Sequence, residues 1–230
     1  MEQHPPEGFP FGEANHGEGN PLPLFITFVL DETSSMHSIA GATIEGFNSY
    51  VREIRSTDPQ AQFTLVRFNT QKLDRSKTGP LSEVRELTAH EYNPIGGTPL
   101  IDAVATAIRA TEEEIAHRKV RAIVVVQTDG EENSSRRFSK EQLKSLIEEK
   151  QRDGWAFVFL GAGIDAFHGA EQLGFQRNTV MSYDRTKSPE VFRAASRSTI
   201  SYASSGLVAD ASFTKGERMS VDEHNLVEGS

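Results

Sequence analysis

Three short stretches of the sequence gather hydroxyl and carboxylate side chains next to apolar runs. They are Asp31-Glu32-Thr33-Ser34-Ser35-Met36, Gly96-Gly97-Thr98-Pro99-Leu100 and Gln127-Thr128-Asp129-Gly130-Glu131-Glu132. Together they offer oxygen ligands and no imidazole or thiolate, a set that suits a hard cation, magnesium first and then manganese or calcium. Two aspartates, Asp31 and Asp129, match the charge of a divalent ion. Octahedral magnesium also keeps water ligands, which an acidic group of a partner could displace.

The elements around these stretches decide whether the stretches can meet. Residues 25–30 form an almost continuous apolar, β-rich run that ends at Asp31, which is typical of a strand buried on both faces. Residues 122–126 are typical of a second such strand, with Asp129 close behind it. Pro99 suits the first turn of a helix and precedes an apolar helical stripe. Each stretch therefore follows a strand or opens a helix, and all three can converge at one end of a sheet.

Strands and helices are expected to alternate along the rest of the chain. Further strands are expected at residues 62–69, 155–160 and 179–183, a short polar edge strand at 71–77, and helices around 44–54, from 139 onwards, at 165–173 and at 189–204. Ser139, with Gln142 three residues later, has the pattern of a capping box. The alternation predicts an α/β fold with a doubly wound, mostly parallel central sheet flanked by helices and one short antiparallel edge strand. In such sheets the ligand site lies at the carboxyl ends of the strands, near the switch point.

The ordered set of motifs resembles the metal-ion-dependent adhesion site (MIDAS) of the von Willebrand factor A (vWA) family, which includes the inserted domains of integrins. Asp31, Thr33 and Ser35 match the family's Asp-x-Ser-x-Ser motif, with threonine in the first hydroxyl position. Thr98 matches its separate threonine, and Asp129 matches its later aspartate. The resemblance implies that the hydroxyls of Thr33, Ser35 and Thr98 contact the metal directly. It also implies that Asp31 and Asp129 act mostly through water.

Each motif also has an ordinary structural alternative. Asp31 and Ser35 could cap the first helix, residues 96–99 could be only a turn and a helix start, and Asp129 with the following glycine could be only a turn. One Asp-x-Thr-x-Ser motif alone is weak, because it occurs often by chance. Three motifs in the family's order over about residues 24–205, each at a strand end or helix start, favour the metal site and a Rossmann-like vWA fold.

The resemblance implies a divalent-metal-dependent protein–protein interaction module, which captures an Asp or Glu of a partner protein through a MIDAS magnesium ion. A metal-dependent hydrolase or phosphoryl-transfer enzyme is one alternative, and a structural subunit whose metal only stabilises the loops is another. Metal-assisted hydrolysis usually needs a base or nucleophile close to the metal. The sequence shows no Ser-His-Asp set, second carboxylate cluster or Walker-type loop, which leaves Glu32 and Glu131 as the plausible bases. We therefore predict that the chain is not an enzyme.

The composition narrows the class of partner and the compartment. Among 230 residues 24 are basic and 33 acidic, and this net charge of -9 argues against nucleic acid because phosphate binding needs a basic face. The chain has no cysteine, which excludes a disulfide framework and a thiolate zinc site. The N-terminus lacks the pattern of a signal peptide and no apolar run reaches the length of a membrane span, so we expect a cytoplasmic protein. We expect a flexible N-terminal arm at residues 1–22, a vWA domain at 23–206 and a flexible C-terminal tail at 207–230.

Overall fold

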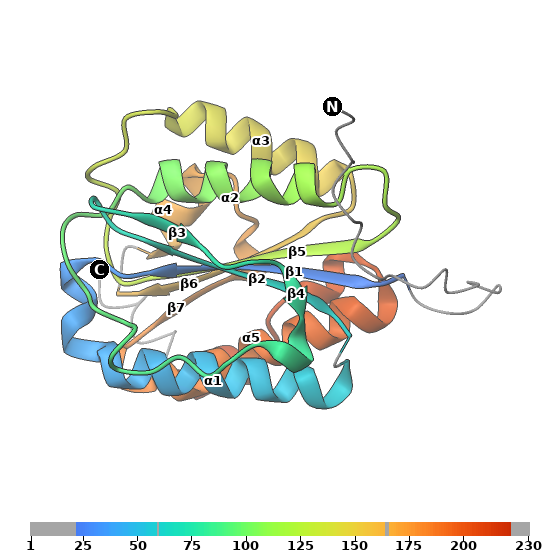
Figure 1. The fold of residues 1–230 in the computed structure, drawn as a ribbon, viewed down its shortest axis with the longest axis horizontal. Coiled ribbons are helices and arrows are strands. Elements are labelled where there is room, and N and C mark those ends of the chain that lie inside the picture. The colour runs from blue at the N-terminus through green and yellow to red at the C-terminus, as the bar shows by residue number, and fades with distance from the viewer. Residues whose placement is uncertain (1–21, 59, 164–165, 222–230) are drawn as a thin grey trace, which may run out of the picture.

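The computed structural model describes residues 22–58, 60–163 and 166–221. The strands are β1 (Leu24–Asp31), β2 (Gln62–Phe68), β3 (Leu73–Arg75), β4 (Gly79–Pro80), β5 (Arg121–Thr128), β6 (Ala156–Ala162) and β7 (Val180–Tyr183). The helices are α1 (Ala40–Thr57), α2 (Leu100–Glu114), α3 (Lys140–Arg152), α4 (Ala166–Gln172), α5 (Ser188–Ser205) and α6 (Lys215–Ser220). The sheet is the middle of three layers, with α2, α3 and α4 on one face and α1 and α5 on the other (Figure 1).

The sheet has the order β3-β2-β1-β5-β6-β7, and β4 also pairs with β2. β1 is parallel to β2 and β5, and β6 is parallel to β5 and β7. The short strands β3 and β4 run antiparallel to β2. The chain thus winds away from β1 in both directions, which places the switch point at the carboxyl ends of β1 and β5. The predicted fold class is confirmed: the sheet is doubly wound and mostly parallel, is flanked by helices, and has a short antiparallel edge.

Apolar side chains fill both interfaces between the sheet and the helices. Along β1, Ile26, Phe28 and Leu30 belong to the core on the side of α1 and α5. Phe25 and Val29 belong to the core on the side of α2 and α3. This alternation explains the continuous apolar run, because both faces of a central parallel strand are covered by helices. The strand that ends at the first polar loop is therefore held on both sides.

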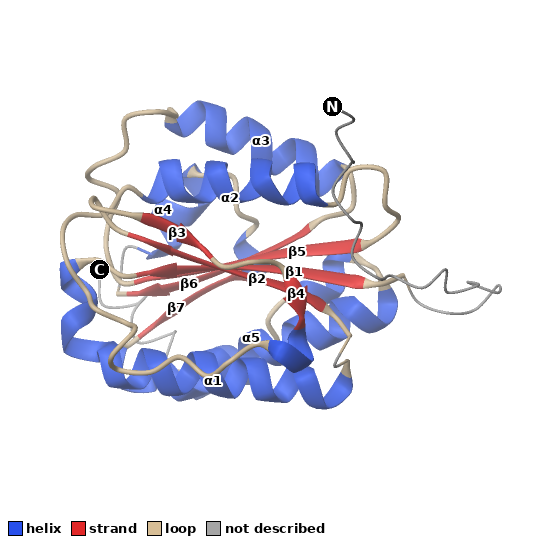
Figure 2. Cartoon of the chain, in the orientation of Figure 1, coloured by secondary structure: helices blue, strands red, loops and turns tan. Residues whose placement is uncertain are grey.

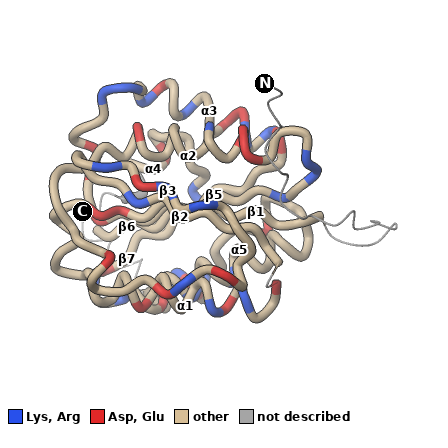
Figure 3. Tube along the Cα trace, in the orientation of Figure 1, with Lys and Arg blue, Asp and Glu red and all other residues tan. Residues whose placement is uncertain are grey.

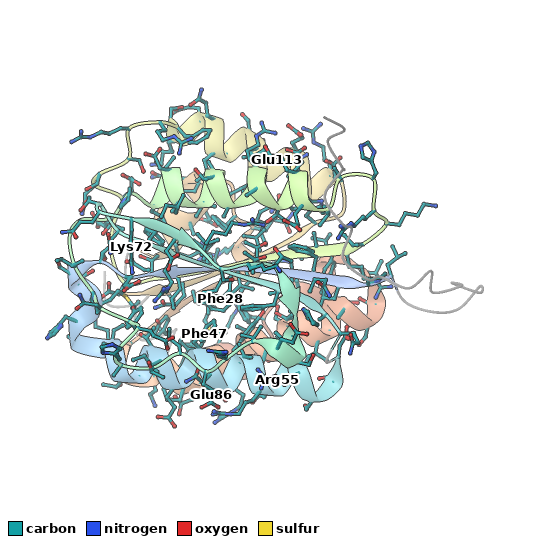
Figure 4. All side chains as sticks on the ribbon, in the orientation of Figure 1. Phe28, Phe47, Arg55, Lys72, Glu86 and Glu113 are labelled. Carbon is teal, nitrogen blue, oxygen red and sulfur yellow. The ribbon has the colours of Figure 1, made fainter. Side chains whose placement is uncertain are left out.

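Aromatic packing fixes α1, and with it the loop that follows β1. The ring of Phe28 lies edge-on to Phe47 and Tyr50 of α1, with ring centroids 5.3 and 5.0 Å apart. Figure 4 shows Phe28 and Phe47 in the layer between the sheet and α1. Gly46 lets α5 approach α1 closely, because a Cβ at this position would lie only 2.2 Å from the ring of Phe192. Burial of several large aromatic rings makes this layer a rigid support.

Residues 207–221 fold back onto the domain. Phe213 and Val221 are buried in the core beneath α5. Arg218 Nη1 donates a 2.9 Å hydrogen bond to a carbonyl oxygen of β7. The prediction of a flexible tail from residue 207 is therefore wrong for residues 207–221. The apolar residues of this stretch are few and lack a helical period, so the sequence pattern did not reveal that they are buried.

The remaining terminal predictions fall mostly on residues that the structure does not describe. Residues 1–21 of the predicted arm and 222–230 of the predicted tail lie outside the described residues. Leu22, the first described residue, has an exposed side chain. Among the helices of the described part of the chain, none is long and apolar enough to cross a lipid bilayer.

Candidate metal centre

The three polar loops meet at one edge of the sheet. The carboxyl ends of β1 and β5 and the start of α2 lie together on the left in Figure 2. Two backbone hydrogen bonds join the loops to one another. The amide of Ser34 donates to the carbonyl of Gly96 at 3.0 Å, and the amide of Asn133 donates to the carbonyl of Thr98 at 3.1 Å. The convergence predicted from the sequence is therefore present in the backbone itself.

Asp31, the last residue of β1, is fully buried. Its Oδ1 accepts a 2.8 Å hydrogen bond from the amide of Thr33, and its Oδ2 accepts a 2.5 Å hydrogen bond from the hydroxyl of Thr128. Burial, with a smaller contribution from the Asp129 carboxylate, raises the pKa of Asp31 to about 6, although these hydrogen bonds oppose the rise. The edge thus holds two neighbouring carboxylates whose charges a divalent cation would offset.

A chain of oxygen contacts links the other four predicted ligands. Thr98 Oγ1 lies 3.4 Å from Thr33 Oγ1, which lies 3.2 Å from Ser35 Oγ. The Ser35 hydroxyl then donates a 2.6 Å hydrogen bond to Asp129 Oδ1. With Asp31, whose carboxylate holds the amide of Thr33, all five predicted residues lie together although they come from three loops.

A glycine keeps side-chain atoms away from this oxygen cluster. A Cβ at Gly130 would lie 3.1 Å from Thr98 Oγ1 and 3.3 Å from Ser35 Oγ. These distances are tighter than ordinary van der Waals contact, so any larger residue would press on the hydroxyls. The amide of Gly130 also donates a 3.1 Å hydrogen bond to the hydroxyl of Thr128, which anchors the third loop to the end of β5. The cluster is therefore bordered by backbone, as an ion-sized site requires.

Acidic residues that the sequence analysis did not single out lock the second and third loops together. Glu132 Oε2 accepts a 2.8 Å hydrogen bond from the amide of Ile101, at the start of α2. Its Oε1 accepts hydrogen bonds of 2.8 and 2.7 Å from two amides of its own loop. Asp102 of α2 in turn accepts hydrogen bonds from the amides of residues 136–138. The polar run after Asp129 was the available signal, because such residues hold loops by side-chain to backbone hydrogen bonds.

The two candidate bases are placed very differently from each other. Glu32 is buried, and its Oε1 accepts a 2.7 Å hydrogen bond from the amide of Asn93. Lys72 Nζ lies 3.0 Å from Glu32 Oε2 and supplies the opposite charge, and Figure 4 labels Lys72 near the same edge of the sheet. Glu131 is exposed. The suggestion that Glu32 could act as a base therefore finds no support in its contacts, which tie the side chain to neighbouring loops.

Arg185 reaches the cluster from the turn between β7 and α5. Its Nη2 lies 3.0 Å from Asp129 Oδ2. The side chain of Asp129 is fully buried, whereas that of Arg185 is 49% exposed. No described residue donates a hydrogen bond to Asp129 Oδ2, so the contact with Arg185 is an ion pair without hydrogen-bond geometry. No motif or spacing in the sequence connects these two residues, so the pair could not be predicted from the sequence.

The donor chemistry decides which cation fits. Among the described residues no group of three or more His, Cys, Asp or Glu could hold a metal. The cluster instead combines two carboxylates with three hydroxyls, a set of hard oxygen donors that suits magnesium, manganese or calcium. The buried Asp129 Oδ2, which lacks a hydrogen bond, and the close approach of Gly130 to the hydroxyls of Thr98 and Ser35 both fit a small cation at this place.

Comparison with known proteins shows the fold. No protein-family model and no curated protein matches the sequence. The chain is similar to a von Willebrand factor type A structure from Catenulispora acidiphila, with a TM-score of 0.56 and 16% identity, over 78% of this chain and 43% of that one. It is similar to proximal thread matrix protein 1 from the mussel byssus with a zinc-occupied MIDAS motif (TM-score 0.54, 14% identity, 75% of this chain and 47% of that one). It is also similar to the SpRpn10 VWA domain (TM-score 0.52, 13% identity, 74% of this chain and 92% of that one).

The chain therefore spans less than half the length of the first two of these solved chains, and most of the third. At such low identities the likeness establishes the architecture, which is that of vWA domains. The zinc in the mussel structure belongs to that protein.

Proposed function

We propose that this chain is a divalent-metal-dependent protein-interaction module, whose MIDAS consists of Asp31, Thr33, Ser35, Thr98 and Asp129. Magnesium is the proposed metal, with manganese or calcium as alternatives. The observation that carries the proposal is the continuous series of oxygen contacts from Thr98 to Asp129 at the carboxyl edge of the sheet. The zinc-occupied MIDAS of the mussel protein, a structure of the same fold, supports a divalent ion at this place.

The proposed ligands leave one coordination position of the ion open, and the ion stays electrophilic because both aspartates act mostly through water. The hydroxyls of Thr33, Ser35 and Thr98 would bind it directly, and the two aspartates would support it mostly through water. Octahedral magnesium then keeps at least one position for a water molecule. A carboxylate of a partner protein can displace that water and gain a charge-assisted interaction, whereas a neutral amide gains much less. The proposed partner is therefore a protein that presents an Asp or Glu.

The same ligands do not favour catalysis. Threonine and serine hydroxyls cannot deprotonate a water molecule at neutral pH. Glu32 is engaged by Lys72, so Glu131 is the remaining candidate base. We therefore propose that the chain is not an enzyme, and expect no hydrolysis of p-nitrophenyl phosphate with magnesium or manganese. A nucleic-acid partner is disfavoured too, because α1 and α3 carry charges of both signs along their lengths (Figure 3).

Metal binding is tested first, by calorimetric titration of chelator-treated protein with Mg²⁺ and with Mn²⁺. We expect one site in the wild type and no binding in Asp129→Asn, which removes a charge but keeps the shape of the side chain. Far-UV circular dichroism checks that the variant is folded. A wild type that binds neither ion would overturn the proposal.

The preference for an acidic ligand is tested next, and the natural partner is not needed. A ligand that displaces a water molecule from bound Mn²⁺ lowers the relaxation rate of the water protons. We expect a short peptide with one central Glu to lower this rate, and the same peptide with Gln to leave it unchanged. Equal responses to both peptides would favour the alternative in which the metal only stabilises the loops.

A further inference from the structure

We propose that Arg185 competes with the divalent metal for Asp129, so that the affinity of the site is set by an internal cation as well as by its ligands. The inference rests on the proposed metal site and adds a residue from a fourth loop to it.

The turn that carries Arg185 is tightly fixed. Asp184 Oδ1 accepts hydrogen bonds from the amide and the hydroxyl of Thr186, at 2.9 and 2.6 Å. The amide of Lys187 donates to the carbonyl of Asp184 at 2.8 Å. These contacts form a single 3-10 turn that leads directly into α5, so the backbone presents Arg185 at the metal-site edge. About half of the side chain lies in solvent, which leaves it a hydrated side towards which it can turn.

The ion pair is of a kind that a metal can replace. Asp129 Oδ2 is buried and receives no hydrogen bond from the described residues, so the guanidinium compensates it by charge alone. A guanidinium normally binds a carboxylate through directed, often bidentate, hydrogen bonds. Since those are missing here, Arg185 loses little directional bonding when it leaves. Its exposed side can be hydrated as soon as it swings outwards.

The charge balance gives the sign of the effect. Asp31 and Asp129 together supply two negative charges, of which Arg185 offsets one. A divalent ion offsets both, and it repels a guanidinium that stays beside Asp129. Metal binding must therefore expel Arg185, and the energy of the broken ion pair is subtracted from the affinity for the metal. If Arg185 instead held Asp129 in the right position for the metal, its removal would weaken binding, which is the opposite sign.

The test is a calorimetric titration of chelator-treated protein with Mg²⁺ and with Mn²⁺ at low ionic strength. We expect Arg185→Gln to bind about tenfold more tightly than the wild type, a size typical of a partly exposed ion pair acting on a divalent ion. Arg185→Lys keeps the charge and should stay within about threefold of the wild type. Arg52→Gln is the matched control, since Arg52 of α1 forms an exposed pair with Glu86 and the change removes the same charge, and it should leave the affinity unchanged.

Nuclear magnetic resonance of the wild type gives a second readout that does not depend on a variant's folding. The ¹⁵Nε–¹Hε signal of Arg185, identified by its loss in Arg185→Lys, should shift when Mg²⁺ is added, while that of Arg52 should not. Equal or weaker metal binding by Arg185→Gln, or an unmoved Arg185 signal in metal-saturated protein, would overturn the inference and leave the metal site standing. Absence of metal binding in the wild type would overturn the proposed metal site and, with it, this inference.

Discussion

Two clusters of charged side chains differ in which partner of the ion pair is buried, the cation or the carboxylates. The first lies near the end of α3, where the side chain of Lys150 is only 6% exposed. Its Nζ lies 2.6, 2.8 and 3.2 Å from carboxylate oxygens of three side chains that are 38%, 48% and 55% exposed, namely Glu112, Glu149 and Asp153. Burial lowers the pKa of Lys150, but the hydrogen bonds that its ammonium group donates to these carboxylates outweigh this and raise the pKa above its ordinary value. Here the cation is buried and its partners are hydrated.

At the proposed metal centre the arrangement is reversed. The carboxylates of Asp31 and Asp129 are buried, and the cation beside them, Arg185, is half exposed. The two clusters lie at opposite ends of the sheet, because α3 starts towards the end where β1 and β5 finish and ends where β6 begins.

This difference indicates whether each cluster requires a further cation to balance its buried charge. A buried ammonium group with three hydrated carboxylates is already compensated by the protein. Two buried carboxylates with one hydrated guanidinium keep one charge that the described side chains do not offset, and buried charge is costly unless it is paired or coordinates a metal. The exposure of each partner, more than the number of acidic residues, therefore separates a structural cluster from a metal site.

The largest effect that would test this comparison is expected for Asp31→Asn, which keeps the side-chain shape and removes one buried charge. Its metal affinity should fall at least roughly a hundredfold, since even groups behind the ligands matter by ten- to a hundredfold. In the wild type, magnesium at about 100 times Kd should raise the free energy of unfolding by about 2.7 kcal/mol, and the variant should lose this gain. Thermal unfolding with magnesium and with EDTA measures it.

Asp153→Asn is the matched control for Asp31→Asn, because it removes a carboxylate from the Lys150 cluster. It should keep the full stabilisation by magnesium. A normal gain in the Asp31 variant would remove that residue from the metal site, and with it the contrast between the two ends of the sheet.

An intermediate effect is expected for Thr98→Ala. This change removes one of the three hydroxyls but no charge, so metal affinity should fall roughly tenfold and remain measurable. Thr98→Ser retains the hydroxyl and is the matched control, expected to bind within about threefold of the wild type. Calorimetry with Mn²⁺ compares the three proteins. If Thr98→Ala and Thr98→Ser behaved alike, the hydroxyl would be no ligand, and the contact with Thr33 would serve only to hold the second loop.

Much of the architecture could be predicted from the sequence, because the signals are strong and local. The apolar runs at residues 25–30 and 122–126 indicate strands covered on both faces, and they are β1 and β5. The capping box at Ser139 and Gln142 is present at the start of α3. The proximity of the five proposed ligands also followed from motif order, since parallel strands bring their carboxyl ends to one edge. That these residues bind metal stays a prediction.

The features that could not be predicted from the sequence depend on contacts between segments that are far apart in the chain. Arg185 and Asp129 are joined by no motif, and only the turn before α5 brings them together. Glu32 follows Asp31 directly, but its carboxylate is held by the amide of Asn93 and by Lys72 and does not join the oxygen cluster. Phe213 is buried although its neighbours are polar, because α5 offers it a place in the core.

The smallest effect is expected for Lys150→Met, which tests the cluster around Lys150. The three carboxylates around this amine stay hydrated when it is removed, so they do not become buried, unpaired charges. Methionine also fills much of the space that the lysine chain occupies beside Trp155, where the ammonium group lies 5.8 Å from the ring centroid. We therefore expect a loss of about 1 kcal/mol in the free energy of unfolding, typical of ion pairs with exposed partners.

The loss should be equal in magnesium and in EDTA, because an already compensated cluster at the far end of the sheet has no part in metal binding. Chemical denaturation in both solutions measures it, with Arg52→Gln as a second exposed-pair control. A loss that appeared only with magnesium would show that the two ends of the sheet are coupled, and the distinction between a self-compensated cluster and a metal-requiring one would no longer hold.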